Sequence, residues 1–131
     1  MLNELMTTAG ENLKGIPWTV HPRPQMKRES YVNLNGDWEF AISQSPQLPE
    51  EYPDTIRLPF CPESLLSGLK LQIAPGSYLY YRRLLPELED RTGKRVLLHI
   101  GAADQITTVY VNGKACGGGE HRHIVSDGGR R

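Results

Sequence analysis

Apolar and polar residues alternate along several short stretches of this chain, which is the pattern of half-buried β-strands. The clearest stretch covers residues 31–42, with a turn predicted at Asn35-Gly36. After the turn, Trp38, Phe40 and Ile42 recur at every second position, separated by acidic or small residues. We therefore expect a strand that turns its aromatic side to a core and its carboxylates to solvent.

The same alternation predicts three more strands, over residues 56–60, 78–85 and 96–100. Pro59 cannot donate a backbone hydrogen bond, so the first of these strands lies at a sheet edge or ends there. The last has apolar residues at nearly every position, so we expect it to be buried on both sides.

Short segments between these strands carry loop and turn signals. Residues 43–54 are rich in serine and proline and are expected to form a loop. Residues 62–66 begin with a proline and are followed by Gly68, which favours a single helical turn closed by the glycine. A further turn is expected at residues 90–93.

A β-hairpin is expected near the end of the patterned region. Residues 106–111 are mostly β-branched, and Asn112-Gly113 follows directly. A two-residue Asn-Gly loop is a strong hairpin signal because both turn positions need a positive φ. The returning arm, 114–116, is expected to be short. Residues 117–131 are rich in glycine and are expected to form an irregular, poorly packed tail.

The N-terminal residues 1–21 have weak periodicity and are expected to form an arm. Leu2, Leu5 and Met6 fit one face of a short helix, and the prolines beyond favour extended chain. Several short strands with little helix predict an all-β sandwich.

Composition narrows the functional classes. With 131 residues the chain is about one domain, too short for a TIM barrel, which takes about 250 residues. The 15 basic and 15 acidic side chains give a net charge of zero, so the cationic excess that binds nucleic acid is missing. No stretch has the apolar length of a membrane span or of a signal peptide, so a cytoplasmic protein is expected. Cys61 and Cys116 lack a C-x-x-C spacing and are expected to be free thiols.

Four blocks of sequence resemble, in the same order, the N-terminal sugar-binding jelly-roll domain of family 2 glycoside hydrolases, the family of β-galactosidases and β-glucuronidases. The blocks are Tyr31–Phe40, Leu58–Gly68, Tyr80–Arg83, and Val96–Asp104 with Thr108–Gly113. The resemblance implies a galactose-binding-domain-like β-sandwich over residues 22–116. It implies no cofactor and no catalytic residue, because both catalytic glutamates of this family belong to a barrel.

The resemblance also sets expectations for partners. Carbohydrate would be contacted only with the barrel present, the full enzyme could be a homo-oligomer, and neither nucleic acid nor membrane is expected. After Cys116 the chain departs from the family, which usually continues with a His-acid-Gly-Gly-aromatic stretch. This departure favours a truncated or frame-shifted product, with a sandwich that is incomplete at its C-terminus and prone to aggregate.

Asp104 is the candidate substrate-binding residue, because in the family the loop after this strand reaches the sugar. Its functional reading is a carboxylate that binds hydroxyl groups. Its structural reading, which the residue type favours, is a turn residue that accepts backbone N–H bonds. This region does not specify which sugar the full-length enzyme would cleave. Gln72, in the second loop that approaches substrate, stays unassigned.

Other residues whose side chains could bind a metal or take part in catalysis have simpler explanations. His121 and His123, with Glu120, Asp127 and Cys116, are ligand types for zinc, but the glycine-rich tail favours solvation. Glu50, Glu51, Glu87, Glu89 and Glu120 fall in predicted loops and are interpreted as solvated charges.

An aromatic sugar platform is a further alternative. Its members would be Trp38, Tyr78, Tyr80 and Tyr81, although the alternation around Trp38 favours core packing. A free-standing carbohydrate-binding module would need such a platform, and a decayed fragment without its own function would not.

Overall fold

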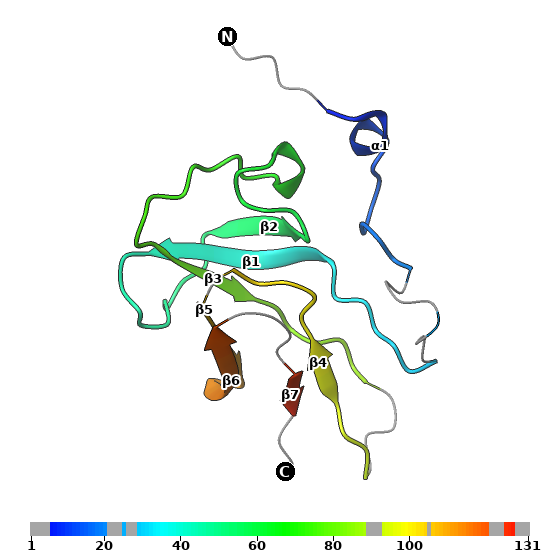
Figure 1. Ribbon diagram of the computed structural model, residues 1–131, viewed down its shortest axis with the longest axis vertical. Coiled ribbons are helices and arrows are strands. Elements are labelled where there is room, and N and C mark those ends of the chain that lie inside the picture. The colour runs from blue at the N-terminus through cyan, green and yellow to red at the C-terminus, as the bar shows by residue number, and fades with distance from the viewer. Residues whose placement is uncertain are drawn as a thin grey trace. The chain divides into compact units, whose positions relative to one another are not determined.

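The computed structural model describes residues 6–20, 25, 29–88, 93–104, 106–120 and 125–127. The chain divides into two compact units, Met1–Leu84 and Leu85–Arg131. In the described residues all strand pairs are antiparallel and helix is confined to very short segments (Figure 1). The prediction of an all-β chain is confirmed. The boundary between the units lies inside the range 22–116.

The first unit is built on a three-stranded sheet of order β2-β1-β3. Strand β1 (Gly36–Ser43) lies between β2 (Asp54–Leu58) and β3 (Tyr78–Arg82), as Figure 1 shows. The predicted strand-loop-strand order is therefore confirmed, with β3 ending earlier than expected.

One face of this sheet carries the core of the first unit. Phe40 and Ile56 are fully buried, and the Phe40 ring meets the edge of Tyr81 at 5.1 Å between ring centroids. Trp38 is half-buried and Ile42, at the end of β1, is 39% exposed. The alternation therefore identified the core face correctly, but only its central residue is deeply covered.

The predicted strand over residues 31–34 is wrong, since these residues are irregular and β1 begins at Gly36. Asn35-Gly36 does not join two strands, although Gly36 does have a positive φ of 105°. The reason is that the backbone carbonyls of Leu34 and Asn35 accept hydrogen bonds from side chains, which compete with a strand ladder.

Strand β2 is an edge strand and ends at Leu58, directly before Pro59, as predicted. The expected helical turn is present as the 3-10 helix η2 (Leu65–Ser67). Ser64 caps its start, and Gly68 closes it with a φ of 85°.

The N-terminal arm contains helix α1 (Thr8–Glu11), capped by the hydroxyl of Thr7. This helix starts after Met6, and the other two residues of the predicted helical face, Leu2 and Leu5, lie outside the described residues. Beyond α1 the arm is irregular, and Pro17 is buried.

The second unit holds two two-stranded sheets. Strand β4 (Leu97–His99) pairs with β7 (Val125–Asp127), and β5 (Ile106–Val111) pairs with β6 (Lys114–Glu120).

The predicted hairpin is confirmed, with φ of 50° at Asn112 and 77° at Gly113. Three expectations for this unit are corrected. The returning strand β6 continues to Glu120, β7 lies in the expected irregular tail, and Leu97 and His99 of β4 are exposed rather than buried. Of the turn expected at residues 90–93, only Gly93 lies within the described residues.

Candidate functional site

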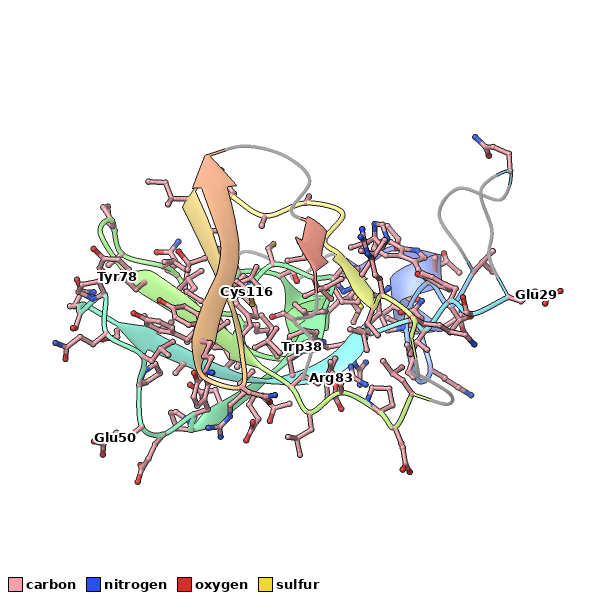
Figure 2. All side chains as sticks on the ribbon, turned by 90° about the horizontal axis from the view of Figure 1, so that it is seen from below. Glu29, Trp38, Glu50, Tyr78, Arg83 and Cys116 are labelled. Atoms are coloured by element: carbon pink, nitrogen blue, oxygen red, sulfur yellow. The ribbon has the colours of Figure 1, made fainter. Side chains whose placement is uncertain are left out.

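The side chains of Trp38 and Arg83 form a polar cluster in the first unit and lie near each other in Figure 2. The Arg83 guanidinium donates to the carbonyl oxygens of Leu34 at 2.8 Å and Asn35 at 3.0 Å. Its carbon lies 5.9 Å from the centroid of the Trp38 ring, and the indole N–H donates to the Leu34 oxygen at 2.7 Å. Both side chains therefore fix the segment that leads into β1.

Two asparagines join that segment to the N-terminal arm. The Asn33 side-chain amide donates to the Trp18 carbonyl at 2.8 Å, and the Asn35 amide donates to the Pro17 carbonyl at 3.1 Å. The Asn33 side-chain oxygen also accepts from the backbone N–H of Asn35 at 2.7 Å. These bonds hold the buried Pro17 in place and present Trp18, which has a φ of 48° and is 68% exposed.

On the opposite face of the sheet, Glu39 and Arg82 form a two-point ion pair across β1 and β3. Arg82 Nε and Nη2 lie 2.6 Å and 2.9 Å from the two Glu39 carboxylate oxygens. The hydrogen bond from Arg82 lowers the pKa of Glu39. The guanidinium also stacks on Tyr52 at 4.0 Å from the ring centroid. This arrangement ties the loop between β1 and β2 to the sheet and leaves neither charge available for catalysis.

A shallow, open hollow of about 250 Å³ lies where η2 meets the strands β1 and β2. Its lining residues are Asp37, Thr55, Arg57, Leu65, Leu66, Ser67 and Gly68. Arg57 Nε and an Asp37 oxygen are 3.7 Å apart, so their charges largely compensate each other. Ser67, the buried residue of the lining, is already bonded to the backbone of Pro62, Ser64 and Leu69. The buried hydroxyl of Ser67 is therefore used within the fold rather than directed to a ligand.

Tyr81 has the most perturbed titration among the described residues. Burial raises the pKa of Tyr81 to about 12, and the charges of Glu63 and Cys61 contribute further. Its hydroxyl therefore stays protonated at neutral pH and can serve as a hydrogen-bond donor but not as a nucleophile.

Asp104 lies in an exposed, irregular segment between β4 and β5. Within the described part of the chain, no hydrogen bond or ion pair involves its carboxylate. The backbone N–H bonds of the structural reading are not found there. The carboxylate is accessible to a ligand, but no second polar side chain is shown beside it.

The proposed aromatic platform is not assembled as a set. Trp38 is half-buried and uses its N–H internally, and the Tyr80 hydroxyl donates to the Ser45 carbonyl at 2.7 Å. Tyr78 is 44% exposed and Tyr81 is 39% exposed, and the Tyr81 ring also packs against Phe40. Sequence reasoning missed the more exposed Trp18, because its conformation depends on the distant asparagines.

The remaining candidates stay without an assigned role. Cys61 and Cys116 are free and exposed, and the described residues contain no group of three or more potential metal ligands. His121 and His123 lie outside the described residues. Of the loop acids, Glu50, labelled in Figure 2, is exposed, as are Glu51, Glu87 and the amide Gln72.

Among the described residues, no helix has the length and apolar character required to cross a membrane. Comparison with known proteins adds no assignment, since no family model and no curated protein matches the chain.

Proposed function

We propose that the chain is the non-catalytic, jelly-roll-type β-sandwich domain of a family 2 glycoside hydrolase acting on β-glycosides. The support comes from the four sequence blocks that resemble that domain, which occur in the family's order along an all-β chain; three of them include a stretch of strand, and Leu58–Gly68 is mostly loop and η2. In this role the domain shapes the rim of an active site whose catalytic carboxylates come from a separate barrel.

The observation that carries the proposal is the structural use of the charged residues in those blocks. The Arg83 guanidinium donates hydrogen bonds to two backbone carbonyls, and Arg82 and Glu39 form an ion pair with each other. A retaining glycosidase needs two carboxyl groups about 5–5.5 Å apart, one acting as acid and base and the other as nucleophile. Glu39 is paired with Arg82 across two strands, so it is better explained as a residue that stabilises the sheet than as one of these two catalytic carboxylates.

Asp104 is the residue by which this domain would touch sugar. Its exposed carboxylate can accept hydrogen bonds from hydroxyl groups. A single carboxylate gives little affinity, so carbohydrate binding should require the barrel as the other wall of the site.

The first test measures the chain alone. We expect no hydrolysis of aryl β-galactosides, β-glucuronides or β-mannosides, and no saturable binding of the free sugars up to about 10 mM, a range that corresponds to a binding free energy near −3 kcal/mol. Turnover would contradict a non-catalytic domain. Saturable binding would favour the free-standing carbohydrate-binding module instead.

The second test supplies this chain to a family 2 enzyme from which the N-terminal sandwich has been removed, and measures the recovery of activity. The variant Asp104→Asn should raise KM, while the matched change Glu50→Gln in an exposed loop should not. Equal kinetics of the two variants would remove Asp104 from the sugar site. Failure to restore any activity, with a folded chain, would contradict the domain assignment.

A further inference from the structure

Strand β5 (Ile106–Val111) has an unusual edge for a sheet strand. Its six residues contain no charge, no proline and no glycine, and most are β-branched or aromatic. One edge is hydrogen-bonded to β6, and among the described residues no strand pairs with the other edge. A neutral, strongly β-forming segment with a free edge is a template for pairing with another strand.

The exposure of β5 fits such pairing. Val109 is only 8% exposed, whereas Ile106 is 73% and Tyr110 is 42% exposed on the other face. Thr108 lies between them and is exposed as well. The outer face of β5 therefore presents an aliphatic and an aromatic side chain to solvent, beside an edge that pairs with no other strand of the described residues.

The outer strands of the first sheet are protected in a way that β5 is not. Strand β2 carries Asp54 and Arg57, and strand β3 carries Arg82. Charged residues on edge strands discourage pairing with further copies. Among these three strands, β5 alone lacks a charge.

We propose that the free edge of β5 pairs antiparallel with β5 of a second copy of this chain, and this proposal does not depend on the glycosidase assignment. A two-fold axis perpendicular to the sheet, passing midway between the two copies of Thr108, keeps the same face of both strands on one side of the joined sheet, because side chains alternate with a period of two. It sets Thr108 opposite Thr108, Ile106 opposite Tyr110, and Thr107 opposite Val109.

Two of these three kinds of opposed pair, Ile106 with Tyr110 and Thr108 with Thr108, are favourable. Aromatic with β-branched residues and threonine with threonine stabilise antiparallel pairs, and no like charges meet. The neutrality of the strand makes it compatible with itself, whereas a charged partner strand would gain no ion pair. A second copy is therefore the partner that fits this edge.

The experiment is sedimentation velocity of the full chain over a range of concentrations. In the variant Thr108→Lys the two introduced ammonium groups would lie directly opposite each other, and we expect the dissociation constant of the dimer to rise at least tenfold. Ile106→Lys, at a side chain that is 73% exposed, should weaken the dimer as well and serves if the first variant does not fold. Gln47→Lys makes the same charge change in an exposed loop of the first unit and should leave association unchanged.

A cross-link locates the contact. In a background with Cys61→Ser and Cys116→Ser, Thr108→Cys should give a covalent dimer under mild oxidation by diamide, because opposed residues of antiparallel strands lie within disulfide reach. Gln47→Cys is the matched control. A chain that is monomeric at all concentrations, equal effects of Thr108→Lys and its control Gln47→Lys, or equal cross-linking at both cysteines would overturn the proposal.

Discussion

Replacing Arg83 by methionine tests whether the segment before β1 is held by the side chain that the structure indicates. The change removes two charge-assisted hydrogen bonds, to Leu34 at 2.8 Å and to Asn35 at 3.0 Å, and the contact with Trp38. The Leu34 oxygen keeps the indole N–H as a donor, so Asn35 is the carbonyl that loses its side-chain partner.

The expected loss follows from these contacts. Hydrogen bonds to a charged group contribute about 1.5–3 kcal/mol each to stability. Both bonds come from one nitrogen of Arg83 and both are part-buried, so water compensates some of the loss and the free energy of unfolding should fall by about 2 kcal/mol. With a urea dependence of about 2 kcal/mol per M, the midpoint should fall by about 1 M.

Arg82→Met is the matched control, because it makes the same change at the neighbouring position on the solvent-facing side. Arg82 pairs with Glu39 at the surface, and exposed ion pairs contribute little. Urea unfolding followed by far-ultraviolet circular dichroism should therefore show a much smaller shift. Equal shifts for the two variants, or an unchanged Arg83→Met midpoint, would refute the assignment of Arg83 as the anchor.

Three further predictions concern the core, the hairpin and alkaline stability. Phe40→Ala, at a fully buried residue, should lower the free energy of unfolding by about 3–5 kcal/mol, and Ile42→Ala, at a residue 39% exposed, by clearly less in the same urea assay. Gly113→Ala should cost about 1 kcal/mol, because a side chain there meets no neighbour but must adopt a φ of 77°; Gly101→Ala, where φ is not positive and space is also open, should leave the melting temperature nearly unchanged. The pKa of Tyr81 is raised from 10.0 to about 12, so the unfolded chain ionises first and stability should fall as the pH rises between these values. Tyr81→Phe should abolish that part of the pH dependence, and an unaltered profile would contradict the raised pKa of Tyr81.

The local elements of this chain could be predicted where a few neighbouring residues decide them. Phe40 marks the core face of β1, Pro59 follows the end of β2, and Asn112-Gly113 makes the hairpin turn. The deciding factor in each case acts over only a few residues. It is side-chain alternation for Phe40, a missing backbone donor for Pro59 and a positive φ for the hairpin turn.

The errors arise where distant residues decide. Residues 31–34 have a strand-like pattern. However, the side chain of Arg83, far along the chain, donates hydrogen bonds to the carbonyl oxygens of Leu34 and Asn35. Strand β6 continues through Gly117, Gly118 and Gly119, whose low strand propensity is overridden by pairing with β5. The intrinsic strand propensity of the residues predicts neither result, because each depends on contacts with residues elsewhere in the chain.

The candidate site was less predictable than the fold. Sequence identified Asp104 through a resemblance, and the accessibility of its carboxylate is a property of the folded chain. The exposure of Trp18 could not be read from its neighbours, because side-chain amides of Asn33 and Asn35 hold the arm on which it lies.

The attachment of the arm bears on where this chain can be cut. A gene fragment that starts at residue 22, the expected start of the sandwich, would discard Pro17 and Trp18 together with the carbonyls that accept from the two asparagine amides. Expression trials of such a shortened chain would then show poor solubility and rapid proteolysis. The cause would be the missing arm and not the rest of the domain. The practical start of the domain therefore lies before Pro17.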